Sequence, residues 1–410
     1  MKIKGNYLRR AVAVLAFLAV TASAGPAPRV VAIGDVHGAY PEFVSILQRT
    51  GLVDGNLDWA GGNATFVQTG DILDRGAQSR KALDLLMKLE AQAGQKQGTV
   101  VALLGNHEVM DMVGDLRYVS AAEYQAFATD QSEKVREQAF RTYQKFVSEH
   151  GTDSTVRKGE VDREKWMAEH PPGFFELRDA YGPKGEYGRW FRMHDAVAQV
   201  GDSIFLHGGL DPELHYRNIE EINKHVHSEL SDFDSLWKSL SDEKAIWPYM
   251  TLNEAIRQVQ AELSADQSGT GMLAPNAKAD ITKLISGLPH YVSMSPQGPL
   301  WYRGLAQQPE GPLGKKLGEM LVKLKVSHIV MGHTVVSRDG ITTRFGGQVF
   351  LIDTGMLASY FQGRASALDI QDGRFKALYA NGDEQVLLGS QDGQKASRSV
   401  PNAADGRLEP

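Results

Sequence analysis

Residues 30–38 read Val-Val-Ala-Ile-Gly-Asp-Val-His-Gly, an apolar run that stops at a glycine, an aspartate and a histidine. A short apolar run rich in β-branched residues and bounded by glycine is typical of a buried strand. Asp35 and His37 lie two residues apart on the segment that leaves this run, so both side chains can bind one ion. The stretch therefore predicts a buried strand with candidate metal ligands at its carboxyl end.

The same pattern recurs along the chain. Five further apolar runs end in polar clusters and are expected to be strands: Thr65–Thr69 before Gly70-Asp71, Val100–Leu104 before Gly105-Asn106-His107, Ser203–Leu206 before His207, His328–Met331 before Gly332-His333, and Val349–Ile352 before Asp353. Helical patterns separate several of these runs, as at Pro41–Arg49 and Ser79–Gln92, which indicates a layered α/β fold. Because ligands of α/β sheets bind beyond the carboxyl ends of the strands, we expect a single site at these ends.

Composition narrows the chemistry that this site can perform. The chain has 410 residues, of which 42% are hydrophobic and 23% charged, enough for one large or two modest globular domains. A net charge of −6 argues against a protein that binds nucleic-acid backbones. The absence of cysteine excludes disulfide scaffolds, thiolate-bound metals and cysteine nucleophiles. Any metal must therefore be bound by His, Asp, Glu or Asn.

The strand-end residues offer oxygen and nitrogen ligands without thiolate, a set that suits Mn, Fe, Zn or similar divalent ions. Two such ions about 3.5–4 Å apart clamp a phosphoryl group and convert a bridging water to hydroxide for in-line hydrolysis. Beside them, His107 is a candidate acid for the leaving oxygen, and Asp74 is a candidate partner that orients its imidazole. Arg75 carries a planar bidentate donor suited to phosphate oxygens.

Three motifs resemble, in order, the signature motifs of phosphoprotein phosphatases: Gly34-Asp35-Val36-His37-Gly38, Gly70-Asp71-Ile72-Leu73-Asp74-Arg75-Gly76 and Gly105-Asn106-His107-Glu108. His207-Gly208-Gly209 and Gly332-His333-Thr334 resemble the two later metal histidines of that family. On these five motifs, spread over about residues 30–360, the chain is identified as a member of the calcineurin-like metallophosphoesterase superfamily. It is most similar to the bacterial Shewanella-like protein phosphatases, which share a Pro299–Gly304-type motif and long insertions.

The resemblance implies a role for each site residue. It implies that Asp35, His37 and Asp71 hold one divalent metal ion, and that a second is held by Asp71, Asn106, His207 and His333. It implies that His107 and Asp74 form an acid dyad, and that the substrate phosphate is bound by Arg75, Asn106 and Arg303. Glu108 is expected to orient its loop, and Asp353 to position a neighbouring one. Asp111 and Asp115 are expected to cap the helix that follows them.

The resemblance also implies a fold, a sandwich of sheets with helices outside. Residues 25–390 are expected to form the catalytic domain, with helical insertions at about 112–201 and 215–299 that form a cap. Residues 1–24 have a basic start, an apolar run and a small-x-small site, the pattern of a secretory signal peptide. We therefore expect export to the periplasm or medium, without stable membrane insertion after cleavage. The polar residues 391–410 are expected to form a disordered tail.

The expected function is hydrolysis of phosphomonoesters on proteins or peptides, or on small phosphoesters. The Ser-Ala-Pro-Asn-Tyr stretch of eukaryotic serine/threonine members is missing, which leaves phosphotyrosine and phosphoserine both open. A nucleotidase or dinucleotide polyphosphate hydrolase is an alternative, and a deep nucleobase pocket built on Trp166, Trp190 and Trp247 would favour it. These tryptophans are expected to be core residues instead. A catalytically silent metal-dependent binding protein is the alternative of another class. The oligomeric state stays open.

Overall fold

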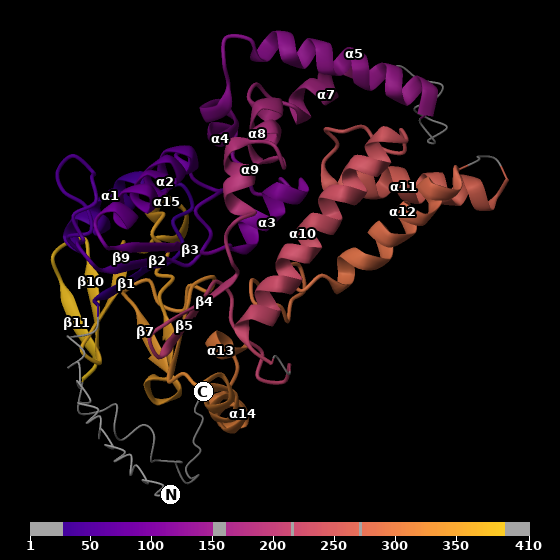
Figure 1. Cartoon of the computed structure of the whole chain (residues 1–410). Helices are drawn as coiled ribbons and strands as arrows, with labels where there is room; N and C mark the ends of the chain where they lie inside the picture. Colours follow the sequence, from indigo (N-terminus) through magenta and orange to yellow (C-terminus); the bar gives the residue numbers. More distant parts are fainter. Residues whose placement is uncertain (1–27, 151–160, 215–216, 270–272, 390–410) are drawn as a thin grey trace, which may run out of the picture.

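The computed structural model describes residues 28–150, 161–214, 217–269 and 273–389 (Figure 1). The expected signal peptide and the expected tail both lie outside these residues. Within them, a β-rich part carries two sheets, and a helical part extends from one side of it (Figure 1). None of the helices in the described ranges is long and apolar enough to cross a membrane.

The β-rich part consists of two mixed sheets. The first has the strand order β11 (Glu384–Leu388), β10 (Arg374–Tyr379), β9 (Ser366–Gln371), β1 (Val30–Ile33), β2 (Thr65–Gln68) and β3 (Thr99–Ala102). The second has the order β4 (Val197–Val200), β5 (Ser203–Leu206), β6 (His328–Met331), β8 (Val349–Leu351) and β7 (Thr342–Arg344). All six strands predicted from sequence are present: β1, β5 and β6 have the predicted ends, and the ends of β2, β3 and β8 differ by at most two residues.

Each sheet contains three parallel strands, and these are the predicted ones. Strands β1, β2 and β3 pair in parallel, with Val30 opposite Thr65 and Thr65 opposite Thr99. Strands β5, β6 and β8 also pair in parallel. Because parallel strands end at the same edge, each sheet presents its strand-end loops as one group. The site is therefore built from two groups of loops, one from each sheet.

Successive side chains along the strands point alternately into two hydrophobic clusters. Ala32 and Val67 of the first sheet pack in one cluster with Phe205, Val330 and Phe350 of the second, so this cluster fills the space between the sheets. The intervening side chains, such as those of Val31 and Phe66, belong to the cluster that also holds the helices. The layers are thus helix, sheet, sheet and helix, which confirms the predicted fold class.

Two kinds of helix surround the sheets. Helices α1 (Tyr40–Arg49) and α2 (Ser79–Gln95) cover the first sheet (Figure 1). Along the chain, α13 (Gly304–Gln307) and α14 (Glu310–Leu324) lie between β5 and β6, and α15 (Ala358–Phe361) follows β8. The helical part holds α3 (Asn106–Val113), α4 (Ala121–Phe127), α5 (Ser132–His150), α7 (Arg163–Glu169), α8 (Phe174–Tyr181), α9 (Glu186–Phe191), α10 (Ile219–Asp242), α11 (Leu252–Gln267) and α12 (Pro275–Gly287). Short 3₁₀ turns, η1 (Leu288–His290) and η2 (Phe345–Gly347), complete the described elements.

Candidate metal centre and catalytic site

The candidate ligands follow the carboxyl ends of β1, β2, β3, β5 and β6, and all of them are buried: Asp35, His37, Asp71, Asn106, His207 and His333. The loops after β2 and β3 touch each other so closely that Gly70 has no room for a side chain. Its φ is +88°, and a Cβ there would lie 2.3 Å from the backbone nitrogen of Gly105. The glycines of the motifs thus let two ligand-bearing loops meet.

Asp71 lies at the centre of the ligands. Its Oδ2 is 3.2 Å from His207 Nε2, 3.5 Å from His37 Nε2 and 3.7 Å from His107 Nε2. The potential ligand atoms form two sets of three, His37-Asp71-His107 and Asp71-His207-His333. Within each set the atoms lie within 4.8 Å of one another, and Asp71 belongs to both sets. A carboxylate between two such sets is in position to serve two cations.

The remaining implied ligands lie around these two sets. Asp35 Oδ2 is 3.8 Å from His37 Nε2, and its Oδ1 accepts a hydrogen bond of 3.0 Å from the backbone nitrogen of His333. His207 Nε2 is 2.9 Å from Asn106 Oδ1 and 2.9 Å from His333 Nδ1. The structure therefore brings together all six ligands that the resemblance implies.

Backbone carbonyls orient two of the imidazoles toward the centre. His37 Nδ1 donates to the carbonyl of Leu73 over 2.7 Å, and His207 Nδ1 donates to that of Thr69 over 3.0 Å. Each ring consequently turns its Nε2 toward Asp71, the side on which a cation would bind. His333 Nε2 is buried and has no hydrogen-bond partner in the described residues. Carboxylates, an amide oxygen and oriented imidazoles without thiolate fit divalent metal ions.

His107 and Asp74 form the predicted pair. His107 Nδ1 donates to Asp74 Oδ2 over 2.5 Å, and both side chains are almost fully buried. This bond leaves His107 Nε2 facing Asp71, so a proton on Nε2 points into the centre. Burial raises the pKa of Asp74, although the hydrogen bond from His107 opposes this shift. The pair can therefore hold a proton beside the metal ligands.

The two arginines approach the site differently. The guanidinium of Arg75 contacts His37 Nε2, and it lies 5.1–5.4 Å from the ring centres of Tyr118, Tyr360 and Phe361. Arg303 donates from Nη1 to the backbone oxygen of His333 over 2.7 Å and to Thr334 Oγ1 over 3.0 Å. Arg75 thus reaches the ligands directly, whereas Arg303 reaches the loop that carries His333.

Five site residues have left-handed backbones, with φ of 47° at His37, 56° at Asp71, 71° at Asp74, 66° at Arg75 and 66° at His333. Such conformations cost a non-glycine residue about 1–2 kcal/mol each, so surrounding bonds have to maintain them. Glu108 supplies several of these bonds, since its carboxylate accepts from the backbone nitrogens of Asp71, Ile72 and Gly105 at 2.8 Å each. Glu108 orients the loop, as its sequence position indicates.

Several residues near the site lie outside the sequence motifs. The rings of Tyr118, Tyr360 and Phe361 come from segments outside the motifs, and no local pattern marks them. Asp353 was marked in the sequence by the Asp-Thr-Gly triplet that follows a strand, but its position near the metal ligands was not predicted. Its Oδ1 accepts from the nitrogen of Gly355 at 2.9 Å, and burial raises its pKa to about 6 beside Asp35. Burial and the charge of Asp353 in turn raise the pKa of the neighbouring Asp35.

The expectation that Asp111 and Asp115 cap the following helix is wrong. Helix α3 begins at Asn106, directly after β3, so Asp111 lies inside it and is buried. The following helix, α4, is capped by Ser120, whose hydroxyl accepts from the nitrogen of Glu123. Asp115 pairs with Arg117 at 2.8 and 2.5 Å. The helix starts earlier than an isolated loop motif indicates, because the strand-end loop itself forms its first turn.

A group of buried carboxyls lies behind Asp74, and Glu123 is its clearest member. Burial, the nearby Asp74 and Glu108 raise the pKa of Glu123 from 4.5 to about 8. The folded state therefore keeps a proton between pH 4.5 and 8 that the unfolded chain has lost, so stability falls as pH rises through this window. Glu123→Gln is expected to flatten this fall, whereas the exposed Glu164→Gln is expected to leave it unchanged. Urea unfolding from pH 5 to 9 measures both, and parallel slopes in Glu123→Gln and the wild type would contradict the assignment.

A double-sheet α/β fold that gathers these ligands at its strand ends defines the class of metallophosphoesterases. Residues 28–337 match the family model described as Calcineurin-like phosphoesterase, and the chain belongs to this family. It is a phosphoesterase hydrolase, as the motifs predict. Divalent metals are the cofactors of this class, and the two ligand sets around Asp71 are where this chain could bind them.

Named relatives narrow the resemblance. Shewanella-like protein phosphatase 2 of Arabidopsis thaliana is 32% identical over 218 residues, which are 50% of this chain and 52% of the relative. Shewanella-like protein phosphatase 1 of Plasmodium berghei is 24% identical over 358 residues, 85% of this chain and 74% of the relative. Among solved structures, the cold-active protein-tyrosine phosphatase of a psychrophilic Shewanella species has a TM-score of 0.56 at 23% identity, covering 88% of this chain and 81% of that one. The similarity to this solved structure supports the fold of the chain.

Proposed function

We propose that this chain is a metal-dependent phosphomonoesterase that acts on phosphorylated proteins or peptides and prefers phosphotyrosine. The carrying observation is the aromatic collar, defined as Tyr118, Tyr360 and Phe361, around Arg75 at the site. Tyr118 and Tyr360 are 39% and 58% exposed, so their rings are accessible beside a buried centre. A phenyl group packs on such rings with a gain of about 0.5–1.5 kcal/mol beyond area burial, whereas a serine methylene offers no ring.

The chain's own residues divide the work of hydrolysis. Bound divalent metals supply Lewis-acid stabilisation of the phosphoryl group and activate the attacking water. Asp35, His37 and Asp71 would hold one of them, and Asp71, Asn106, His207 and His333 the other. Arg75 binds the phosphoryl oxygens, while Arg303 holds the His333 loop and adds positive charge near the phosphate. His107 donates the proton from Nε2 to the leaving oxygen, and Asp74 keeps its imidazole in place through Nδ1.

The packing of the tryptophans does not provide for a nucleobase. Trp166, Trp190 and Trp247 are all buried in the core between the helices and carry less than a tenth of their free exposure. Their rings pack on other aromatic residues, such as His170 against Trp166 at 4.1 Å between ring centres. They are core residues, as predicted from the sequence, and the phosphoprotein substrate is favoured over a nucleotide.

Hydrolysis after chelation and after readdition of Mn²⁺ tests the proposal. The panel consists of a phosphotyrosine peptide, a phosphoserine peptide, a mononucleotide and diadenosine tetraphosphate, with the chain from Gly25 onward. We expect metal-dependent phosphate release with the highest kcat/KM for phosphotyrosine, and a smaller advantage of that peptide in Tyr360→Ala. A preference for the nucleotides would move the assignment to a nucleotidase. No turnover with any divalent metal would favour a binding protein instead.

Export is a second part of the proposal. It rests on the signal-like residues 1–24, which lie outside the described residues. An exported enzyme would meet phosphorylated peptides and small phosphoesters outside the cytoplasm, and no nucleic-acid partner is proposed. N-terminal sequencing of the protein from the periplasm or medium of an expressing bacterium checks this, with a start near Gly25 as the expected result. A full-length protein retained in the cytoplasm would contradict export.

A further inference from the structure

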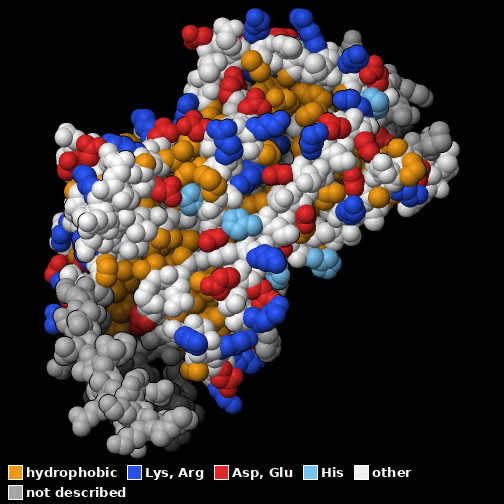
Figure 2. Space-filling model, in the orientation of Figure 1, with side chains coloured by type: hydrophobic (Ala, Val, Ile, Leu, Met, Phe, Trp, Pro, Cys, Tyr) orange, Lys and Arg blue, Asp and Glu red, His pale blue; other side chains and the backbone are white. Residues whose placement is uncertain are grey.

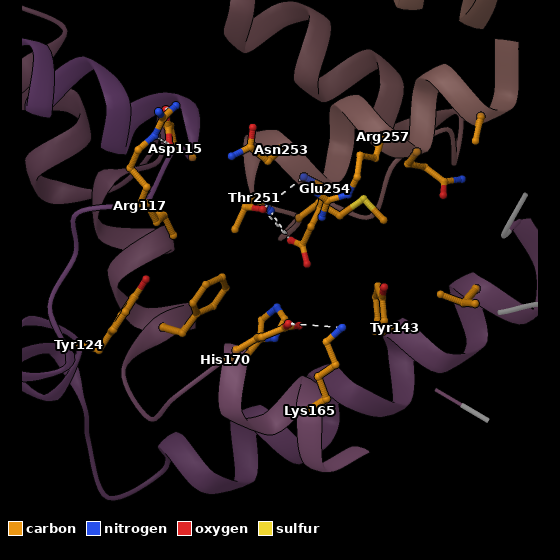
Figure 3. Close-up of a pocket in the computed structure, with 18 residues that line it drawn as sticks. Asp115, Arg117, Tyr124, Tyr143, Lys165, His170, Thr251, Asn253, Glu254 and Arg257 are labelled. Carbon is orange, nitrogen blue, oxygen red and sulfur yellow. Dashed lines mark hydrogen bonds and ion pairs between the residues drawn. The ribbon is translucent and has the colours of Figure 1, made fainter. Parts of the chain in front are cut away.

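A pocket of about 670 Å³ lies in the helical part, outside the metal centre. Its walls come from both long insertions: α5, α7 and the start of α8 on one side, and Met250 to Ala261, including the first turns of α11, on the other. Figure 3 shows Tyr124, His170, Lys165 and Tyr143 facing Thr251, Asn253, Glu254 and Arg257 across it. This volume is within the range of specific ligand sites, so the pocket can hold several atoms of a partner.

The pocket and the catalytic centre share one segment of chain. Residues 114–117 line the pocket, and the next residue, Tyr118, belongs to the aromatic collar. The ring of Tyr118 lies 5.0 Å from that of His107, and its backbone oxygen accepts from the nitrogen of Arg75 at 3.2 Å. Helix α3, which joins the two regions, has 8 residues and is therefore about 12 Å long. An extended peptide covers this distance in about three to five residues.

The charged residues of the pocket leave one cation available to an acidic partner. Three of its carboxylates are already engaged: Asp115 pairs with Arg117, Glu254 accepts from the nitrogen and hydroxyl of Thr251, and Glu169 lies 3.9 Å from Lys165. Arg257 is exposed, and no carboxylate of the described ranges lies within ion-pair distance of it. The lining therefore has an available positive charge at Arg257 and partly shared ones at Arg117 and Lys165. Figure 2 shows Lys and Arg side chains together with Asp and Glu side chains over the helical part on this face.

The remaining lining residues suit carbon chains and peptide groups. Tyr124, Tyr143 and Phe174 present aromatic rings to the pocket, and Asn253 and Gln258 present side-chain amides. Burial lowers the pKa of His170, whose Nδ1 bonds to the carbonyl of Trp166 at 2.8 Å, so this ring remains neutral. Rings, amides and an unpaired cation together match a short peptide with acidic side chains better than a free inorganic anion, which would leave the aromatic rings without a contact.

We propose that this pocket binds acidic residues of the substrate chain about three to five positions from the phosphorylated residue. The inference rests on the proposed phosphoprotein function and adds a specificity site to it. Arg257 pairs with an acidic side chain, while the aromatic wall packs against the intervening residues. The pocket is remote from the metal ligands, so it selects peptides and takes no part in the phosphoryl transfer.

Charge reversal at Arg257 tests this inference. Two phosphotyrosine peptides are compared, one with aspartates and one with lysines at the third to fifth positions on both sides. Arg257→Glu is expected to lower kcat/KM about tenfold for the acidic peptide, since an attraction becomes a repulsion, and to leave or raise it for the lysine peptide. Arg374→Glu, an exposed arginine on β10, serves as the matched control and is expected to change neither. Equal changes for both peptides in Arg257→Glu would overturn the inference.

Two further measurements separate this inference from the proposed function. Phosphotyrosine amide is too short to reach the pocket, so its kcat/KM is expected to stay within twofold in Arg257→Glu. Turnover of the amide with an unchanged peptide ratio would overturn the pocket assignment and leave the phosphatase standing. Binding of the acidic peptide as its non-hydrolysable phosphonate, followed by fluorescence anisotropy, decides the inference without turnover. An unchanged Kd in Arg257→Glu would overturn it even if the chain hydrolyses no phosphopeptide.

Discussion

His107→Ala is expected to lower kcat for a phosphoserine peptide about 100- to 10,000-fold, the usual contribution of a positioned general acid. The physical reason lies in the leaving group. A serine alkoxide is strongly basic and needs a proton as the bond to phosphorus breaks, whereas a tyrosine phenolate, with a pKa of about 10, needs it less. We therefore expect a smaller loss for a phosphotyrosine peptide, and the smallest for nitrophenyl phosphate. Initial rates on the three substrates measure this order.

Two variants complete the experiment on the dyad. Asp74→Asn keeps the shape of the side chain but removes the carboxylate that accepts from His107 Nδ1, so it is expected to lower kcat in the same substrate order. His225→Ala, on an exposed part of α10, is the matched control. Metal content measured by elemental analysis is expected to be equal in all variants. An equal loss on the three substrates, or a loss of metal in His107→Ala, would assign His107 to metal binding instead.

A loss of metal in His107→Ala has a structural basis, because the family resemblance and the structure suggest different roles for His107. The resemblance implies a proton donor, whereas the structure places His107 Nε2 in one of the two ligand sets, as close to Asp71 as His37 is to within 0.2 Å. What separates the two roles is the partner at Nδ1. His37 and His207 bond to backbone carbonyls, whereas His107 bonds to the carboxylate of Asp74, which orients its ring.

The strands and the ligands could be predicted from sequence because both are local patterns. A buried parallel strand is a continuous apolar run, and its end is marked by glycine and polar residues, as at Val30–Ile33 before Asp35. The antiparallel strands β4, β7, β9, β10 and β11 were not predicted. Strand β9 pairs with β1, more than 300 residues away, and its sequence Ser-Ala-Leu-Asp-Ile-Gln carries only a weak apolar signal. Its place depends on a contact that no local pattern contains.

The residues that surround the site could not be predicted from sequence for a similar reason. Asp111 and Glu123 are residue types that usually lie on the surface, and nothing in the sequence marks them as buried. The packing of α3 and α4 buries them behind Asp74. Burial raises the pKa of Asp111 well above its ordinary value, and its two carboxylate oxygens have no partner in the described residues. The aromatic collar likewise combines Tyr118 with Tyr360 and Phe361 across more than 200 residues.

Glu108→Ala is expected to lower the free energy of unfolding by about 3–5 kcal/mol, a larger loss than removal of any single exposed charge. One carboxylate here satisfies the backbone nitrogens of Asp71, Ile72 and Gly105 at 2.8 Å and approaches that of Leu73 at 3.4 Å. Each buried donor left without an acceptor costs about 1–3 kcal/mol, and water that enters the space recovers part of this. Urea unfolding measures the change, with the exposed Glu164→Ala as control.

The same substitution is expected to weaken metal binding about 10- to 100-fold, because the bonds of Glu108 hold Asp71 in its left-handed backbone. Asp71 is the ligand shared by both sets, so a small rotation of its backbone moves it relative to both. Calorimetric titration with Mn²⁺ measures the affinity, and Glu108→Gln, which keeps one acceptor oxygen, is expected to lie between the wild type and the alanine variant. If Glu108→Ala loses stability but binds Mn²⁺ with unchanged affinity, the loop's conformation is set by the contact of Gly70 with Gly105 and not by the carboxylate.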